Sequence, residues 1–436
     1  MKHYSWTIAV LTGAAALATT GCNNMKQIKH APYPETPRGE VVDNYFGTEV
    51  PDPYRWLEDD NSPETAAWVA AENAVTNAYL EQIPFREAIR KRLTQLWNYP
   101  KEGAPAKHGD WWYYSSNDGL QNQAVIYRTT APGQPGEVFL DPNTLSDDGT
   151  VAVGEISFSK DGRYFAYAAA ASGSDWVEIR VMELTGDRIE WVKFSGAVWA
   201  PDSKGFYYSA YDAPKTGTYS SQNQFQKVFY HALGTPQSAD RLIYEDKAHP
   251  LRYFSAWPSQ DGRWLFIVGS EGTSGSEILV RKVSERSFRT LLPGFAYDYR
   301  LVDCQDDNLY FMTNEGASNY ALKRISLTKP GQVATVIPEH RKNLLEGVGK
   351  AGGYLFASYL QDAQNRIAQY DYDGKLVREV ELPAIGAVGG FSGEKEAAEL
   401  YYTLSNYTSP ATIYRYDIAS GKSTLYKAPE VAFDPS

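Results

Sequence analysis

Two stretches rich in serine and glycine are the places where this sequence could hold a catalytic nucleophile. They are Ser172-Gly-Ser174 and Gly272-Thr-Ser-Gly-Ser276. A serine hydrolase places its nucleophile on a sharp strand-to-helix turn with the pattern G-x-S-x-G, so that the hydroxyl can attack an acyl carbon. Neither stretch has the second spaced glycine, and neither precedes a helical pattern. We therefore predict that both are loops, although a catalytic triad assembles in space and spacing alone does not exclude one.

The histidines and cysteines show no spacing typical of metal ligands. The six histidines are scattered along the chain at His3, His30, His108, His231, His249 and His340. Zinc sites use closely spaced pairs of cysteine or histidine, so we expect neither a metal nor a cofactor. Only two cysteines occur, Cys22 and Cys304. Cys304 lies in an apolar, strand-like context, and we expect a small buried residue there rather than a nucleophile.

The first 22 residues have the pattern of an export signal. Basic residues precede an apolar run from Trp6 to Leu17, which is too short to span a bilayer as a stable anchor. The pair Gly21-Cys22 resembles the end of a bacterial lipobox, in which the cysteine is lipidated, although Thr19 stands where leucine is usual. We expect an exported lipoprotein, periplasmic or anchored to the outer membrane through Cys22, with residues 23–32 as a polar tether. An ordinary secretory signal, giving a secreted protein, is the alternative.

The composition limits the classes of function. Hydrophobic residues make up 43% and charged residues 22%, which is usual for a globular protein. Aromatic residues reach 14%, and such side chains favour half-buried β surfaces. The net charge of −11, without any run of Lys or Arg, argues against a nucleic-acid binder because nothing would offset the phosphate charge.

Residues 33–101 carry the pattern of two helices. Ser62-Pro63-Glu64 combines an N-cap residue, a first-turn proline and a first-turn acid, and an apolar face follows at three- and four-residue spacing. A second helix is predicted after Pro84, with an apolar stripe formed by Phe85, Ile89, Leu93, Leu96 and Trp97. Such a stripe has to be buried, either against the region that follows or against another domain.

From residue 102 to 427 the hydrophobic period changes to two and a repeat appears, in which a tight turn precedes a strongly aromatic strand. The seven copies are 107–114, 158–167, 199–208, 258–266, 304–311, 350–356 and 392–402. The six intervals from Gly109 to Glu396 cover 287 residues, or about 48 per repeat, as in a propeller blade. Aspartates in Asp-Gly turns such as Asp161-Gly162 and Asp261-Gly262 are expected to stabilise those turns through local backbone hydrogen bonds. We predict a mainly β fold, a seven-bladed β-propeller preceded by a short α-helical arm. A long array of β-sandwiches is the weaker alternative.

Several stretches resemble the prolyl oligopeptidase family and occur in the order of that family. They are Asp52-Pro-Tyr-Arg-Trp-Leu-Glu-Asp59, Gly119-Leu-Gln-Asn-Gln123, Phe139-Leu-Asp-Pro-Asn143 with Leu145-Ser-Asp-Asp-Gly-Thr-Val151, Phe158 to Tyr167, and Ser172-Gly-Ser-Asp-Trp176. The resemblance implies a seven-bladed propeller inserted into an α/β-hydrolase domain. Residues 33–101 would then be the N-terminal arm that docks on the hydrolase domain, 102–427 the propeller, and 428–436 the start of the link to the rest of that domain.

The function that follows from the resemblance is a serine endopeptidase that cleaves short peptides after proline. The catalytic serine, aspartate and histidine would lie beyond Ser436, so this chain would have no catalytic residue, would select substrates by size and would be inactive alone. The hydrolase domain would dock on the stripe that begins at Phe85. By the resemblance, Val181, Tyr253 and Thr273 correspond to propeller residues that line the family's substrate cavity, although the family often has Phe, Met and Cys there. Ordinary packing within the blades is the alternative for all three. The alternative is a stand-alone, lipid-anchored propeller that binds a peptide or a partner protein.

Overall fold

The computed structural model describes residues 28–182, 186–214, 222–329 and 331–433. The predicted signal segment, Cys22 and the last three residues lie outside the described residues. The chain divides into two compact units, the first ending at Leu93 and the second beginning at Thr94. Within the described residues, no helix combines the length and the apolar character needed to cross a bilayer.

The first unit begins with a small hairpin and a helical segment. Its elements are β1 (Val42–Tyr45), β2 (Thr48–Pro51), the 3-10 helix η1 (Arg55–Glu58), α1 (Pro63–Glu81) and the larger part of α2 (Arg86–Trp97). The side chain of Arg55 pairs with Asp43 of β1 and, through Nε, with Oδ2 of Asp52 at 2.6 Å. The Asp52–Asp59 stretch therefore fixes the hairpin to the turn that precedes α1.

Both predicted helices are present. Ser62 caps α1, and its hydroxyl accepts a hydrogen bond from the Thr65 N–H at 3.0 Å. The predicted apolar stripe of α2 lies largely in solvent. Phe85, Ile89, Leu93 and Trp97 have exposed fractions between 50% and 64%, and Leu96 is half-buried. The stripe is therefore an exposed apolar surface of the described residues.

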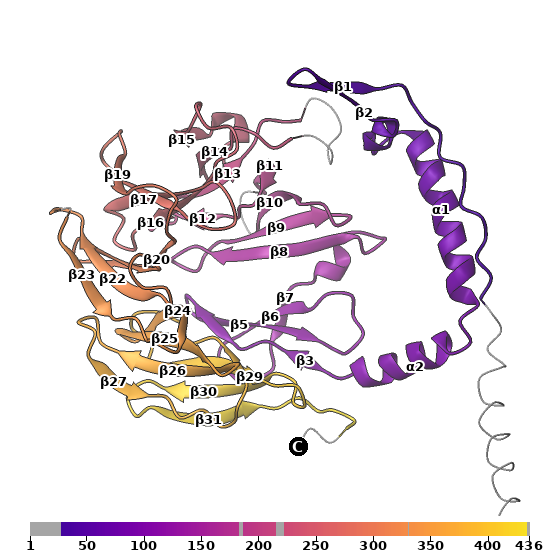
Figure 1. Ribbon diagram of the computed structural model, residues 1–436. Helices are drawn as coiled ribbons and strands as arrows, with labels where there is room; N and C mark the ends of the chain where they lie inside the picture. Colours follow the sequence, from indigo (N-terminus) through magenta and orange to yellow (C-terminus); the bar gives the residue numbers. More distant parts are fainter. Residues whose placement is uncertain (1–27, 183–185, 215–221, 330, 434–436) are drawn as a thin grey trace, which may run out of the picture. The chain divides into compact units, whose positions relative to one another are not determined.

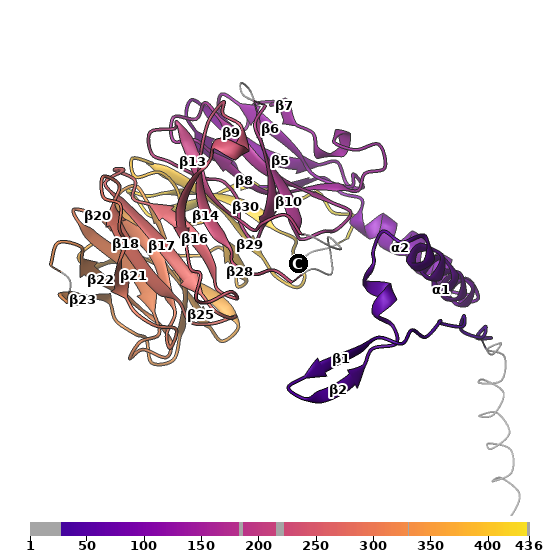
Figure 2. The same cartoon turned by 90° about the horizontal axis from the view of Figure 1, so that it is seen from above.

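The second unit is a ring of seven antiparallel blades (Figures 1 and 2). Blade 1 contains β3 (Lys101–Glu102), β4 (Ala106–His108), β5 (Trp111–Asn117), β6 (Val125–Thr129) and β7 (Glu137–Leu140). Blade 2 contains β8 (Val151–Phe158), β9 (Phe165–Ala171), β10 (Trp176–Met182) and β11 (Arg188–Lys193). Blade 3 contains β12 (Val198–Trp199), β13 (Gly205–Ala210), β14 (Lys227–Ala232) and β15 (Arg241–Glu245). Two short 3-10 helices, η2 (Pro142–Thr144) and η3 (Gln237–Ala239), lie in connecting loops.

The remaining four blades are four-stranded sheets. Blade 4 contains β16 (Tyr253–Pro258), β17 (Trp264–Ser270), β18 (Glu277–Lys282) and β19 (Arg289–Leu292). Blade 5 contains β20 (Tyr299–Gln305), β21 (Asn308–Thr313), β22 (Ala321–Ser326) and β23 (Val333–Ile337). Blade 6 contains β24 (Leu344–Ala351), β25 (Tyr354–Gln361), β26 (Gln364–Tyr370) and β27 (Leu376–Glu379). Blade 7 contains β28 (Ala387–Gly389), β29 (Glu399–Ser405), β30 (Thr412–Asp417) and β31 (Lys422–Lys427). The predicted seven-bladed propeller is confirmed.

The repeated turns have the predicted local hydrogen bonds. In the turn between β8 and β9, the Asp161 carboxylate accepts from the Ser159 hydroxyl at 2.7 Å and from the Arg163 N–H at 3.1 Å. The turn between β16 and β17 repeats this arrangement at Asp261, with distances of 2.6 and 3.0 Å. These aspartates fix the turn geometry, which explains why the motif recurs along the chain.

The alternation of strands gives the propeller two distinct faces. The chain enters the propeller at Lys101 and leaves it at Lys427 on the same face, which we call the proximal face. The first strand of each blade begins at this face, and the last strand ends there. The Asp-Gly turns lie at the other, distal face. In Figure 1, β16, β20 and β24 lie toward the centre of the ring, and β19, β23, β27 and β31 lie at its rim.

Apolar side chains fill six of the seven junctions between blades. The six core clusters of the described residues join blades 1 and 2, 2 and 3, and so on to 6 and 7. Blades 1 and 7 instead meet through an edge-to-face contact of Trp112 with Tyr401 and an ion pair of Glu102 with Lys427. In the described part of the chain, no strand of one end pairs into the sheet of the other. Side chains therefore close the ring.

Candidate functional site

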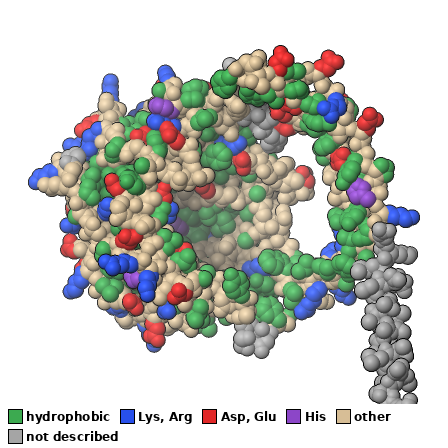
Figure 3. Space-filling view, in the orientation of Figure 1, with side chains coloured by type: hydrophobic (Ala, Val, Ile, Leu, Met, Phe, Trp, Pro, Cys, Tyr) green, Lys and Arg blue, Asp and Glu red, His purple; other side chains and the backbone are tan. Residues whose placement is uncertain are grey.

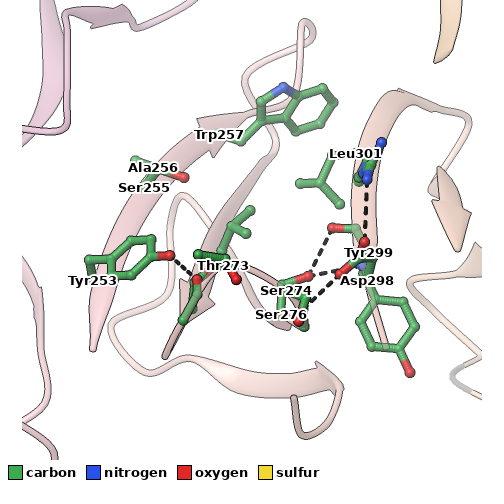
Figure 4. Close-up of a pocket in the computed structure, with 15 residues that line it drawn as sticks. Tyr253, Ser255, Ala256, Trp257, Thr273, Ser274, Ser276, Asp298, Tyr299 and Leu301 are labelled. Carbon is green, nitrogen blue, oxygen red and sulfur yellow. Dashed lines mark hydrogen bonds and ion pairs between the residues drawn. The ribbon is translucent and has the colours of Figure 1, made fainter. Parts of the chain in front are cut away.

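A cavity of about 370 Å³ opens at the proximal face, where blades 4 and 5 meet. Its walls come from β16, from the loop between β17 and β18, and from the beginning of β20 (Figure 4). Tyr253 and Thr273, both predicted to line a substrate cavity, are among the lining residues. The structure thus brings these two together, although they belong to different segments of blade 4.

The loop between β17 and β18 is held firmly against β20. The N–H of Gly275 donates to Oδ1 of Asp298 at 2.7 Å, and the Ser276 hydroxyl accepts from the N–H of Tyr299 at 2.9 Å. A side chain at Gly275 is excluded, because its φ is +80° and a Cβ would lie 2.0 Å from the carbonyl oxygen of Phe295. The Tyr253 hydroxyl donates to the carbonyl oxygen of Gly272 from the opposite wall. The cavity is therefore pre-formed.

The polar groups of this cavity have opposite charges. The Asp298 carboxylate accepts from the Tyr320 hydroxyl, and Nη2 of Arg300 lies 3.3 Å from its Oδ2. The hydrogen bond from Tyr320, with those from Gly275 and Arg300, lowers the pKa of Asp298, so the carboxylate stays ionised at neutral pH. Trp257 and Leu301 supply apolar surface deeper in the cavity. Such a mixture of apolar wall and a few fixed polar groups can bind a peptide segment.

Val181 lies elsewhere. It belongs to β10, which starts at the proximal face, and it stands one residue before the distal end of that strand. Its side chain is 5% exposed and packs in the core between blades 2 and 3 with Ile179 and Ile189. Alternation in β10 explains this placement, because Ile179 and Val181 share the face that points into the core. The structure does not bring Val181 to Tyr253 and Thr273.

A row of aromatic side chains lies on the proximal face and was not predicted from the sequence. Trp176 makes edge contacts with Trp191 and with Tyr211. Burial, followed by the charge of Tyr253, raises the pKa of Tyr211. At its end, Phe194 is 63% exposed and has a φ of 56°. A left-handed backbone is uncommon for a bulky residue and is not readable from residue types alone.

Side-chain amides bridge the blades at the proximal face. Gln226 donates through Nε2 to the Lys193 carbonyl oxygen in blade 2, at 3.0 Å, and accepts from the Phe254 N–H in blade 4, at 2.7 Å. Gln123 crosses from blade 1 to β8 in the same manner, with contacts of 2.7 and 2.9 Å to the backbone of Val151 and Val153. These bridges link blades 1 to 4 at the proximal face.

Comparison with known proteins identifies the architecture. Residues 34–429 match the family model described as the N-terminal β-propeller domain of prolyl oligopeptidase. The chain belongs to the prolyl oligopeptidase family. The bridging residue Gln123 ends one of the stretches on which the family resemblance was based, so that stretch has a structural role between blades 1 and 2.

Curated relatives agree with this membership. The chain is 42% identical to a prolyl endopeptidase of Elizabethkingia miricola and 40% identical to one of Elizabethkingia meningoseptica, over 444 residues in each case. These alignments cover 100% of this chain and 62% of each relative. The chain thus spans less than two thirds of the length of these prolyl endopeptidases.

Solved structures show the same fold. A structure from a study of two prolyl endopeptidases and their inter-domain dynamics superimposes with a TM-score of 0.85 at 31% identity, covering 93% of this chain and 61% of the other. Prolyl oligopeptidase B from Galerina marginata, solved bound to a 25mer macrocyclization substrate, gives a TM-score of 0.82 at 30% identity, covering 92% and 62%.

The five described histidines of this member of the prolyl oligopeptidase family each contact an aromatic ring, a carboxylate or the backbone. His108 stacks on Phe158 with ring centroids 4.0 Å apart, and His249 lies 2.8 Å from Asp246. His340 accepts two backbone hydrogen bonds, His30 contacts tyrosine rings, and His231 lies between two carboxylates. Cys304 is buried, and burial raises its pKa to about 12, so the thiol stays protonated and unreactive.

Proposed function

We propose that this chain is the substrate-gating propeller of a prolyl oligopeptidase-like serine endopeptidase that cleaves short peptides after proline. The observation that carries the proposal is the family match over residues 34–429, together with 42% identity to a relative named as a prolyl endopeptidase. The relative from Galerina marginata binds a 25mer substrate, which supports a peptide as the ligand of the whole enzyme.

Size selection is the part of this function that the propeller would supply. The propeller face in Figure 3 is hollowed at its centre, and hydrophobic side chains gather in the hollow. The cavity that contains Tyr253 and Thr273 opens beside β16 and β20, the inner strands of blades 4 and 5. A rigid ring of this kind admits an extended peptide and excludes a folded protein. Within it, Tyr253 and Thr273 would contact the peptide, whereas Val181 would act through packing.

The cleavage itself would be performed by a hydrolase domain. Its serine would attack the carbonyl carbon after proline, a histidine would take the proton, and water would release the acyl-enzyme. We propose that the docking surface for that domain is the exposed stripe of Phe85, Ile89, Leu93, Leu96 and Trp97.

The experiment is a turnover assay of the purified 436-residue chain. A chromogenic proline peptide and a serine-directed fluorophosphonate probe are applied to the chain and, as positive control, to the prolyl endopeptidase of Elizabethkingia miricola. We expect hydrolysis and labelling of the control only. Turnover by the isolated chain that the probe abolishes would contradict the proposal.

We also propose that the leader directs export and that Cys22 carries a lipid. The supporting pattern is the apolar run that ends at Gly21-Cys22. Cells fed radiolabelled palmitate should label the wild-type chain and not a Cys22→Ser variant, whereas a Cys304→Ser variant should label as wild type. Equal labelling of the wild type and Cys22→Ser would contradict lipidation at this residue.

A further inference from the structure

His231 is enclosed between two carboxylates at the distal face of the propeller. Its ring is fully buried. Nδ1 forms a hydrogen bond of 2.7 Å with Oδ1 of Asp240, whereas Nε2 lies at an ion-pair distance of 3.3 Å from Oδ2 of Asp187, outside hydrogen-bond geometry. The side chains of Asp187 and Asp240 are themselves only 7% and 2% exposed. Such an arrangement is uncommon, because buried charges are costly unless they are paired.

The two carboxylates come from different blades. Asp187 lies in the turn between β10 and β11 of blade 2, and Asp240 follows η3 in blade 3. A neutral imidazole has one N–H and can present it to only one of them, whereas an imidazolium has an N–H facing each carboxylate. If the ring lost a proton, the lone pair of one imidazole nitrogen would face a buried carboxylate oxygen, and the two would repel each other. The charged ring is the form that this geometry fits.

The other polar groups around His231 do not replace its charge. From β13, the Tyr208 hydroxyl donates to Oδ2 of Asp240 at 2.6 Å, and burial followed by this contact raises the pKa of Tyr208, so it remains a neutral donor. The guanidinium of Arg188 is 3.9 Å from Glu178, and that of Arg241 lies over the Tyr230 ring.

A backbone donor and an aromatic ring complete the surroundings of His231. The Gly234 N–H donates to Oδ2 of Asp187 at 2.9 Å, and the Phe206 ring lies 5.1 Å from the imidazole, centroid to centroid. Burial alone would lower the pKa of His231, but the hydrogen bond and charge of Asp240, with the charge of Asp187, raise it above the ordinary value.

The same junction is joined by further contacts. The Gln237 side chain accepts from the Glu190 N–H and donates to the Glu190 carbonyl oxygen, both at 3.0 Å. Val192 of β11 pairs with Ala210 of β13, so blades 2 and 3 form a single sheet. We propose that His231 is a protonation-dependent latch, which holds blades 2 and 3 together when its imidazole is charged and loosens their junction when the proton leaves.

The direction of the pH effect follows from the raised pKa. Stabilisation by His231 is fully present below the ordinary histidine value of about 6.5 and is lost as the pH rises through the value in the folded protein. Between these two values, the equilibrium for opening the junction should shift by up to about tenfold per pH unit. The proposal goes beyond the gating function and does not depend on it.

The direct test is a titration of the 436-residue chain labelled with ¹³C at the histidine Cε1 position and followed by NMR. We expect the His231 resonance, assigned by its loss in His231→Gln, to titrate above pH 6.5. In Asp187→Asn, the same resonance should titrate at a lower pH, which also assigns it if His231→Gln does not fold. A resonance that titrates at or below 6.5 in the wild type would overturn the proposal.

Hydrogen exchange tests the consequence for the blades. Protection factors of the Glu190 and Val192 amides are compared between wild type and Asp187→Asn from pH 5.5 to 9. We expect the protection factors of the wild type, corrected for intrinsic exchange, to fall as the pH rises. The difference in protection between the wild type and Asp187→Asn should become smaller over the same range. The matched control is His249→Gln, which removes the half-exposed histidine of another histidine–aspartate pair and should leave these amides unchanged. A wild-type advantage that is constant over this range would mean a purely structural role and would refute the latch.

Discussion

Substitution of Asp303 by asparagine should destabilise the propeller in a way that depends on pH. Asp303 lies in β20 near the distal face and is 2% exposed. Its Oδ1 is 2.5 Å from Nζ of Lys350, in β24 of the next blade. Its Oδ2 accepts from the Tyr372 hydroxyl and from Nε2 of Gln305, both at 2.7 Å. This carboxylate of blade 5 thus accepts from two donors of blade 6, Lys350 and Tyr372, and from one residue of its own strand.

The expected loss is about 3 kcal/mol at pH 7, at the lower end of the roughly 3–5 kcal/mol for removing one partner of a buried ion pair. The lower end applies because the Lys350 side chain is 25% exposed and regains water when the carboxylate is removed. An asparagine oxygen can also still accept one of the two neutral hydrogen bonds. Lys350→Met should cost at least as much, since it leaves the carboxylate buried without a cation.

Urea unfolding gives the free energy of unfolding of the wild type, Asp303→Asn, Lys350→Met and the double variant. The double variant should lose at least about 1 kcal/mol less than the sum of the single losses, because both remove the same interaction. Burial raises the pKa of Asp303, but Lys350, Tyr372 and Gln305 together lower it below the ordinary value. The advantage of the wild type is therefore present above about pH 4 and is lost as the pH falls through the lowered pKa.

Two results would refute this reasoning. A loss below about 1 kcal/mol for Asp303→Asn would place the pair among exposed ion pairs, which contribute little. A loss that stays the same from pH 7 to pH 3 would show that the charge of Asp303 does not stabilise the fold.

Three further predictions concern other parts of the chain. Gly205→Ala should destabilise by at least about 2 kcal/mol in urea unfolding, because its Cβ would lie 2.1 Å from a carbonyl oxygen of the neighbouring strand, whereas Gly347→Ala, with nothing within 4 Å, should be tolerated. An equal loss in both would contradict the steric argument. Glu102→Gln removes the ion pair with Lys427 between blades 1 and 7, whose side chains are 22% and 50% exposed, and should change the unfolding free energy by less than about 1 kcal/mol. Ile89→Lys should leave the unfolding free energy within about 0.5 kcal/mol of wild type, because its side chain is half exposed, and light scattering should show less self-association. A large destabilisation there would show that the stripe is buried within this chain.

The blades could be predicted because their signal is local. The turns at Asp161 and Asp261 use residues within a few positions of one another, so the hydrogen bonds that form them leave a recurring pattern in the sequence. The cap at Ser62 is local in the same sense. Residue types and spacing suffice for such features, and the seven-bladed fold followed from counting them.

The candidate site was predicted less completely because it is assembled across blades. Tyr253 and Thr273 meet in one cavity, but Val181 and Ile179 share the inward side of β10, and only the strand register reveals this. Phe194 is exposed and has a left-handed backbone, a conformation that its residue type does not predict. His231 and Asp187 lie 44 positions apart in the chain, so their contact depends on how two blades pack.

The measurement that tests the central claim most directly is the size selectivity of a chimeric peptidase. Residues 34–429 of this chain replace the matching segment of the prolyl endopeptidase of Elizabethkingia miricola, of which this chain covers 62%. If this segment is the gate of a prolyl oligopeptidase, the chimera cleaves a short proline-containing peptide and leaves a folded protein with exposed prolines intact. A folded chimera that cleaves both substrates at similar rates, or that binds a serine-directed probe but never cleaves the short peptide, would contradict that account.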